Sequence, residues 1–413
     1  RDSFYFELKP FFFNSLDNYV KEMVTFKGKM VSAQIFPDFE ELLKVREKDF
    51  SLGFVHKTPE KGYPVYKVKG RFAGEIDLSN RGLWGKGKIQ YLGATLESED
   101  VKFLPKQMLA SAKDFDLAEK RSKEEEVPQV HGELVRLDWK PYRDSMYVRS
   151  EKNAFQIFKS GEHTLTGSLA LTPGGLKGNG LLDWPQAAMT SKQFNFGAFS
   201  AKADTTALKI KAEEVGAIAI QSDRLRSDVD FDKQLGRFKS LDEYLETKLP
   251  LNQYVTSMNE FIWEMNNSMI RFKSDSTKLG TFTSVHPDQD SLRFRGKRAS
   301  YDLKTYLLKV TEVPFIKSAD AMIIPDSGTV YVQPKAIMDS LHNATIICDT
   351  LNKNHKINRA TVALKGRKDY WARGYYEYNV ANKEQEILFS DIVGQRVGKG
   401  KASEKATATR AQG

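Results

Sequence analysis

The sequence predicts a mainly β protein with an elongated repeat architecture, either a β-solenoid or extended jelly-roll sheets, and few short helices. Short stretches of alternating apolar and polar residues recur along the chain, separated by turns that contain Gly or Pro. Strand-favouring aromatic residues are abundant, with 26 Phe and 16 Tyr among 413 residues. In addition, the stretch 68–117 recurs without a gap at 161–210. A fixed period of this kind is typical of repeat proteins.

The two copies coincide when the chain is aligned with itself at an offset of 93 positions (167 − 74). Matching glycines and apolar residues then include Gly74 with Gly167, Ile76 with Leu169, Leu78 with Leu171, Gly82 with Gly175, Gly85 with Gly178, Gly87 with Gly180, Ala94 with Ala187, Phe103 with Phe196, Ala110 with Ala203 and Leu117 with Ile210. If the copies fold alike, Phe103 and Phe196 are buried at equivalent places. Gly85 and Gly178 should then occupy equivalent hairpin turns, where glycine supplies a positive φ.

Turn-rich and charged stretches divide the chain into six predicted segments. They are an N-terminal β-rich segment (1–66), repeat copy one with a charged linker (67–128), a second β unit with repeat copy two (129–212), a strand-rich connector (213–283), a C-terminal β-rung unit (284–398) and a flexible tail (399–413). The charged linker favours a solvated excursion or a short helix. The tail is small, polar and basic, which is typical of a flexible linker.

The stretch 254–272 fits two patterns. Its apolar residues Tyr254, Met258, Phe261, Ile262, Met265 and Met269 have helical spacing. A hairpin is the alternative, with Phe261, Trp263 and Met265 on one strand and Ile270 and Phe272 on the next. The strand-rich surroundings favour the hairpin, and in either case these side chains are expected in the core.

Charge and composition narrow the classes of partner. The chain has 63 basic and 54 acidic residues, a net charge of +9, but the two signs are interspersed, which indicates a solvated surface. Nucleic acid is therefore not favoured as a partner, and anionic lipid or glycan ranks second to an ordinary surface. Cys348 is the single cysteine, so the chain has no intrachain disulfide and no zinc site built from several cysteines.

No apolar run is long enough for a transmembrane helix. The chain begins at Arg1 without an initiator methionine, so we expect a processed protein or a segment of a longer one.

Catalytic and metal-binding patterns do not emerge from the sequence. The six histidines are scattered without a spacing that places two ligands on one face: His56, His131, His163, His286, His342 and His355. The Gly-x-Gly pairs at 85–87 and 178–180 precede predicted strands, whereas a phosphate-binding loop precedes a helix. We therefore predict no catalytic, cofactor-binding or metal-binding residue, no cofactor, and no enzymatic activity.

One aromatic and basic run is a candidate binding surface. It consists of Tyr370, Trp371, Arg373, Tyr375 and Tyr376. Exposed aromatic rings beside cations could stack on a glycan or on bases. The favoured alternative is a strand with one aromatic face buried in the core.

Two resemblances follow from these patterns. The Gly-Leu-x-Gly-x-Gly motif, the Ser-x-x-Val/Phe-x-Phe rungs that follow it, and the run Ala-Asp-Ala-Met-Ile-Ile-Pro-Asp-Ser-Gly at 319–328 resemble the large repeat-rich envelope proteins of Bacteroidota. Many of those proteins have no assigned function. The rungs of 284–380 are similar, more weakly, to the OstA/LptA-type β-jelly-roll proteins that carry lipopolysaccharide across the periplasm. Neither resemblance brings a catalytic motif or a binding residue.

We therefore expect a non-enzymatic structural or partner-binding segment of a large bacterial envelope protein, in the periplasm or associated with the outer membrane. The expected partners are other envelope proteins, with lipid or glycan as further candidates. The alternative is a β-groove that conducts lipid or lipopolysaccharide, for which one side of an open sheet would stay apolar.

Overall fold

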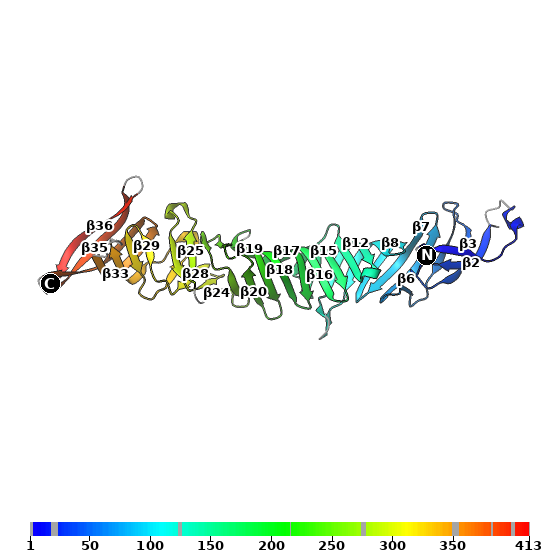
Figure 1. Ribbon diagram of the computed structural model, residues 1–413, viewed down its shortest axis with the longest axis horizontal. Coiled ribbons are helices and arrows are strands. Elements are labelled where there is room, and N and C mark those ends of the chain that lie inside the picture. Colours follow the sequence, from blue (N-terminus) through cyan, green and yellow to red (C-terminus); the bar gives the residue numbers. More distant parts are fainter. Residues whose placement is uncertain are drawn as a thin grey trace. The chain divides into compact units, whose positions relative to one another are not determined.

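The computed structural model describes residues 3–17, 24–122, 126–214, 216–273, 278–348, 355–380, 383–397 and 401–412. Regular structure in these ranges is almost entirely β-strand, with four short 3-10 helices and no α-helix. The predicted mainly β fold class is thus confirmed (Figure 1). The chain divides into two compact units, residues 1–185 with 190–201 and residues 186–189 with 202–413. The dividing line falls within the predicted segment 129–212.

In the first unit, each of the N-terminal strands pairs with the next strand along the chain, and the last two strands form a hairpin. Its strands are β1 (Tyr5–Leu8), β2 (Thr25–Val31), β3 (Phe39–Val45), β4 (Leu52–Lys57), β5 (Tyr63–Val65), β6 (Gly70–Ser79), β7 (Gly82–Tyr91), β8 (Ala94–Leu104), β9 (Gln107–Leu117), β10 (Lys120–Arg121), β11 (Glu126–Val127), β12 (Val130–Lys140), β13 (Ser145–Ser150), β14 (Phe155–Ile157), β15 (His163–Thr172) and β16 (Gly175–Trp184). Its helices are η1 (Phe13–Leu16) and η3 (Pro141–Arg143). The strands β17 (Ala187–Gly197) and β18 (Ser200–Lys211) each contribute residues to both units.

Antiparallel pairing in the first unit runs in order from β6 through β7, β8 and β9 to β12. β13 and β14 lie one after the other along β12 and along β15, so together they fill one strand position with a break in its middle. β4 and β5 divide the position beside β6 in the same way. In the charged linker, β10 and β11 form a two-stranded ladder. Antiparallel ladders favour extended sheets over a solenoid of parallel rungs.

Aromatic side chains fill the interior of the first unit. The Phe103 ring lies with its centroid 5.0 Å from that of Phe72 and 4.8 Å from that of Phe36, both at edge-to-face angles. Trp139 and Phe115 are fully buried as well. Alternation along each strand places these residues on the inner face and polar residues on the outer face.

The two repeat copies consist of equivalent strands. β15, β16, β17 and β18 begin at residues 163, 175, 187 and 200, each 93 positions (163 − 70) after the starts of β6, β7, β8 and β9. Hairpin registers agree too, because Gly74 pairs with Gly87 in the first copy as Gly167 pairs with Gly180 in the second. The expected burial of the two phenylalanines is confirmed, with Phe103 1% and Phe196 4% exposed.

The same serine contact recurs in both copies, and in the first copy it accompanies a bulge. In β8 the Ser98 hydroxyl accepts a hydrogen bond from the Asp100 amide at 3.0 Å, and in β17 Ser191 accepts one from the Gln193 amide at 3.1 Å. The ladder between β7 and β8 shifts register beside Ser98. Beyond the bulge the inward positions move by one residue, which brings Phe103 into the core.

The glycines expected in turns lie inside strands instead. Gly85 and Gly87 belong to β7, and Gly178 and Gly180 belong to β16. The hairpin turns are followed by other glycines, Gly82 with a φ of 103° and Gly175 with a φ of 111°.

Side-chain packing explains the glycines within the strands. A Cβ atom on Gly85 would lie 2.7 Å from Cε2 of Phe103, and one on Gly178 would lie 2.7 Å from Cε2 of Phe196. Real Cβ contacts essentially never come this close, so each glycine leaves room for a phenylalanine ring. Its role is close approach rather than turn formation.

The second unit contains the remaining strands and two helices. Its strands are β19 (Ile218–Asp230), β20 (Leu235–Ser240), β21 (Thr247–Leu249), β22 (Tyr254–Thr256), β23 (Glu260–Glu264), β24 (Met269–Lys273), β25 (Gly280–Ser284), β26 (Arg293–Gly296), β27 (Arg298–Asp302), β28 (Leu307–Thr311), β29 (Ile316–Ser318), β30 (Ala321–Ile324), β31 (Val330–Val332), β32 (Leu341–Cys348), β33 (His355–Gly366), β34 (Asp369–Val380), β35 (Lys383–Val397) and β36 (Lys401–Gln412). Its helices are η4 (Pro287–Gln289) and η5 (Pro334–Ala336).

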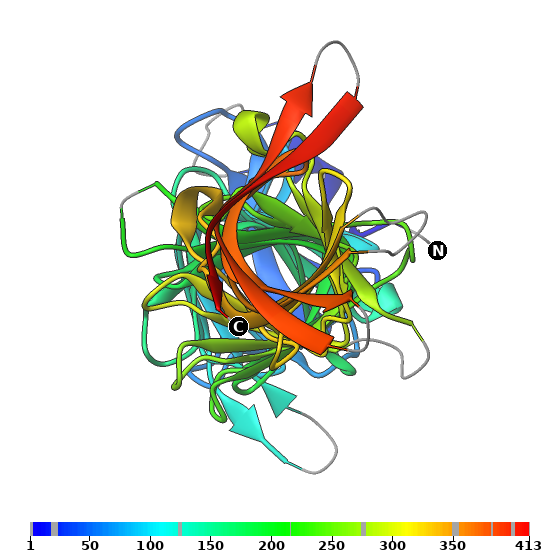
Figure 2. The same cartoon turned by 90° about the vertical axis from the view of Figure 1, so that its left-hand side faces the viewer.

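Beyond β19 the sheet of the second unit continues as two lanes of short strands. The first lane runs through β20, β23, β24, β27, β28 and β31. The second lane runs through β21, β22, β25, β26, β29, β30 and β32. Both lanes start beside β19. A meander from β32 to β36 follows, and Figure 2 shows its last strands, in orange and red, as a curved sheet.

The stretch 254–272 contains the hairpin of β23 and β24, with Phe261 paired to Phe272, so the favoured alternative is confirmed. The stretch 399–413 was expected to be a flexible tail, but it contains β36, which pairs with β35 along most of its length. Alternating Ala and Thr at 406–409 suits a strand, and the edge of β35 offers backbone groups for it to pair with.

Candidate functional site

The structure divides the predicted aromatic and basic surface between two faces of β34. Tyr370 is fully buried, and Tyr376 lies on the same face because side chains alternate along a strand. Trp371, Arg373 and Tyr375 lie on the opposite face, with Arg373 exposed and the two aromatic rings half-buried. The strand therefore combines the two interpretations, with one aromatic face in the core and one at the surface.

Neighbouring strands hold the surface face of β34 in place. The Trp371 Nε1 atom donates a hydrogen bond to Oδ1 of Asp391 at 2.5 Å. The Arg359 guanidinium lies 4.4 Å from the ring centroid of Tyr375 and pairs with both carboxylate oxygens of Glu386 at 2.5 Å. These contacts hold the rings against the sheet, and a flat patch of this kind lacks the concavity that small ligands prefer.

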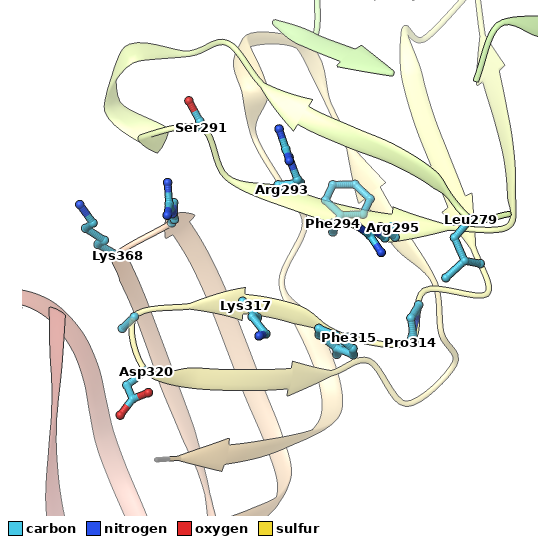
Figure 3. A pocket seen from close by; sticks show the side chains of 12 residues that line it. Leu279, Ser291, Arg293, Phe294, Arg295, Pro314, Phe315, Lys317, Asp320 and Lys368 are labelled. Atoms are coloured by element: carbon cyan, nitrogen blue, oxygen red, sulfur yellow. The ribbon is translucent and has the colours of Figure 1, made fainter. Parts of the chain in front are cut away.

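A hollow in the second unit has a stronger chemical character. Its volume is about 860 Å³, within the usual range for ligand pockets. Figure 3 shows that its side chains come from β26 and β29, from the segments next to these two strands, and from the separate segments that carry Leu279 and Lys368. The lining consists of Leu279, Ser291, Arg293, Phe294, Arg295, Pro314, Phe315, Lys317, Ala319, Asp320, Arg367 and Lys368. We call this site the basic hollow.

The basic hollow forms where the second lane opens. β26 and β29 share a single paired position, Phe294 with Ile316. On one side the ladder stops because Pro314 has no backbone N–H to donate. On the other side the Leu292 amide donates to the Gln289 carbonyl at 3.0 Å, so it is not available to β29. The two strands consequently diverge on both sides of their one pairing.

The turn between β33 and β34 forms a fixed wall of the basic hollow. The Arg367 amide donates to the Gln289 carbonyl at 3.0 Å, and the Arg367 carbonyl accepts from the Ala319 amide at 2.8 Å. Next to it, the buried Ser318 hydroxyl donates to the Gly366 carbonyl at 2.7 Å. Three hydrogen bonds thus fix the backbone that presents Arg367 and Lys368.

Positive charge dominates the basic hollow. Its lining contains five basic side chains and one acidic side chain, Asp320. Lys368 is paired with Asp290 at 3.1 Å, whereas Arg293 donates from Nε to the Thr283 hydroxyl at 3.2 Å. Within the ranges that the structure describes, no ion pair involves the other four cations, Arg293, Arg295, Lys317 and Arg367.

Apolar surface lies beside Arg295, Lys317 and Arg367. Leu279 and Phe315 are 41% and 38% exposed, and the Lys317 Nζ atom lies 5.9 Å from the centroid of the Phe315 ring. The site can therefore offer cations to an anionic group and an apolar contact to whatever is attached to that group.

The basic hollow leaves no pattern in the sequence because its cations come from separate segments. Arg293 and Arg295 alternate along β26, and Lys317 lies in β29. Arg367 and Lys368 come from a turn about fifty positions further along the chain (367 − 317). The alternation Arg-Phe-Arg at 293–295 could have indicated a basic outer face, but only the pairing of the strands brings the other cations to it.

One histidine cluster in the first unit also escaped notice in the sequence. The His56 Nδ1 atom lies 2.8 Å from Oε2 of Glu41, and its Nε2 atom lies 2.9 Å from the Tyr63 hydroxyl. Phe39 stacks on the imidazole with a centroid distance of 3.9 Å. Both ring nitrogens are therefore occupied, which marks His56 as a satisfied structural residue.

Searches for metal sites and for relatives give no further candidate. Across the described residues, no group of three or more His, Cys, Asp or Glu could hold a metal ion. No helix within those same ranges has the length and apolar character needed to cross a membrane. Comparison of the chain with protein-family models, with curated proteins and with solved structures gives no match.

Proposed function

We propose that this chain is a non-enzymatic scaffold segment of a bacterial envelope protein and that it binds its partners through its outer surface. The observation that carries the proposal is the filled interior of the sheets. Large side chains such as Trp139 in the first unit and Tyr301 in the second are fully buried. A scaffold needs a stable core and a solvated exterior, and nothing more specific.

The filled interior also favours a scaffold over a lipid-conducting groove. In the first unit, Phe36, Phe72 and Phe103 contact one another through their rings. In the second unit, Phe282 and Phe294 stack at 5.3 Å. A groove for acyl chains needs a continuous apolar space, and side chains occupy that space at these places.

Outer positions carry charge pairs between neighbouring strands. Lys86 pairs with Glu99 at 2.5 Å, and Lys239 pairs with Glu260 at 3.2 Å. All four side chains are largely exposed, so each pair adds little to stability. A surface of mixed charge is typical of a protein that stays solvated while it contacts other molecules.

Two measurements test this proposal. Lipid extraction of the purified 413-residue chain followed by mass spectrometry should find no more than one lipid per chain, because a conducting groove would hold several lipids along its length. In the native bacterium, photo-crosslinking from exposed strand positions should capture envelope proteins, whereas the same probe at buried positions should not. Several tightly retained lipids per chain, with cross-links only from inner positions, would replace the scaffold with the groove.

A further inference from the structure

We propose that the basic hollow is a binding site for a phosphate group that carries an apolar moiety. Four of its five cations, Arg293, Arg295, Lys317 and Arg367, form no ion pair with any carboxylate of the described residues. A group of unpaired cations facing one concavity therefore attracts an external anion.

The types of cation favour phosphate over other anions. Three of the four are arginines, whose planar guanidinium binds two phosphate oxygens at once. Arg293 is held by the Thr283 hydroxyl, and the backbone of Arg367 is fixed by two hydrogen bonds. Because of these constraints, Arg293 and Arg367 lose less conformational entropy when an anion binds.

The size of the site indicates more than a free ion. A hollow of about 860 Å³ is far larger than a phosphate, so a ligand that fills it has further atoms. Phe315, Leu279 and Pro314 line it beside the cations. Burial of exposed apolar surface on Phe315 and Leu279 would add to affinity for an amphiphile and not for inorganic phosphate.

Either a lipid headgroup or a soluble phosphorylated compound could supply this chemistry. The test therefore compares dihexanoyl phosphatidic acid, kept below its micelle concentration, with inorganic pyrophosphate by titration calorimetry on the full chain. We expect the phosphatidic acid to bind at least about tenfold more tightly, because only it offers an apolar part. Equal affinities for the two probes would show that the hollow makes no apolar contact with its ligand, and the site would then be one for soluble phosphates.

Charge variants show whether the hollow is the site. The double variant Arg295→Gln, Lys317→Gln should lower the affinity for both probes by about tenfold or more, since the loss of even one charge-assisted hydrogen bond costs about this much. The matched control is Lys248→Gln, Lys356→Gln, which removes two exposed strand lysines outside the hollow. If both double variants lose the same affinity, the effect comes from the net charge of the chain, and the basic hollow is not the binding site.

A third variant separates the apolar contact from the charge. Phe315→Ser should weaken binding of phosphatidic acid by several fold and leave pyrophosphate unchanged. All substituted side chains are exposed, so the variants should keep the far-ultraviolet circular dichroism spectrum of the wild type. If a hexaglutamate peptide binds as tightly as phosphatidic acid, the hollow recognises acidic peptides, and the phosphate assignment is wrong.

Discussion

The hairpins β6–β7 and β15–β16 have the same register although many of their residues differ. Ile76 pairs with Gly85 in the first hairpin as Leu169 pairs with Gly178 in the second. The glycines are identical at the paired positions, whereas Trp84 in the first copy is replaced by Lys177 in the second. This comparison teaches that the close approach between glycine and phenylalanine is what both copies retain, while outward positions vary freely.

A second pair of regions keeps its register with even less sequence likeness. β12 with β13 in the first unit and β19 with β20 in the second have registers that match at an offset of 90 positions (225 − 135). On one side of each long strand the ladder is interrupted next to a residue with positive φ, Leu134 at 50° and Arg224 at 54°. The carbonyls of Leu134 and Arg224 each accept a hydrogen bond at 3.0 Å, from the amides of Glu151 and Leu241. The break is thus a feature of the backbone that unlike side chains support.

The largest expected effect comes from the two buried phenylalanines. Phe103→Ala and Phe196→Ala should each lower the free energy of unfolding by about 3–5 kcal/mol, because each leaves a cavity in a packed core. Urea denaturation of both variants measures this. Similar losses would support the equivalence of the copies, whereas a loss below about 1 kcal/mol in either would show that its surroundings are open.

Removing the room that glycine provides should have the next largest effect. Gly85→Ala and Gly178→Ala each place a Cβ atom against a phenylalanine ring, which should cost about 1–3 kcal/mol of unfolding free energy. Gly174→Ala is the matched control for added volume alone, since a Cβ there would meet nothing nearer than the Thr172 hydroxyl oxygen at 3.7 Å, an ordinary van der Waals contact.

A double substitution identifies the cause of that loss. In a Phe103→Leu background the ring is gone, so Gly85→Ala should cost clearly less than it does in the wild type. The same holds for Gly178→Ala with Phe196→Leu. Additive losses in both copies would mean that the nearby backbone, for example the Glu75 carbonyl 2.8 Å from the added Cβ of residue 85, causes the damage instead.

The sequence was sufficient for the mainly β fold and for the repeat, because strand alternation and an ungapped glycine pattern are local signals. It was not sufficient for the role of Gly85, since a glycine within a strand and one in a turn look alike until the ring of Phe103 is placed over it. The positive φ of Leu134 could not be predicted from the sequence either, because leucine rarely adopts this conformation.

The candidate site shows a similar limit. Tyr370 to Tyr376 were noticed because they are adjacent in sequence. The cations of the basic hollow were missed because Pro314 and Leu292 open the ladder far from Arg367 in sequence. A site assembled by strand pairing across separate segments leaves no spacing that a single sequence can reveal.

Relief of backbone strain at Leu134, where the ladder is interrupted, should have a smaller effect on the free energy of unfolding, and this effect should be stabilising. Leu134 is 42% exposed, so Leu134→Gly removes little packing and relieves a left-handed conformation that costs a non-glycine residue about 1–2 kcal/mol. We expect the free energy of unfolding to stay level or rise by up to about 1 kcal/mol. Gln156→Gly, at an exposed extended position, is the control and should be destabilising. Equal destabilisation by both would show that Leu134 stabilises the break through its side chain.

The smallest effect concerns a position at which the two hairpins differ, Gly70 in the first and His163 in the second. Burial beside Phe158 and Trp184 lowers the pKa of His163 from its usual value of 6.5, although Glu162 acts in the opposite direction. The unfolded chain therefore binds a proton more readily than the folded chain, and stability falls as the pH drops below about 6.5. Above that pH His163 is neutral in both states and contributes nothing to the pH dependence.

His163→Gln should flatten this part of the pH profile. Free energies of unfolding measured in urea between about pH 5 and pH 8 should decline less steeply on the acid side for the variant than for the wild type. The comparison uses the slope, because any change in packing shifts the whole curve without changing its dependence on pH. All other ionisable groups are common to the wild type and the variant, so the difference between the two slopes reports on residue 163. Parallel profiles would mean that His163 has the same proton affinity in the folded and unfolded chains, so that its burial in the second hairpin would carry no electrostatic cost that Gly70 avoids in the first.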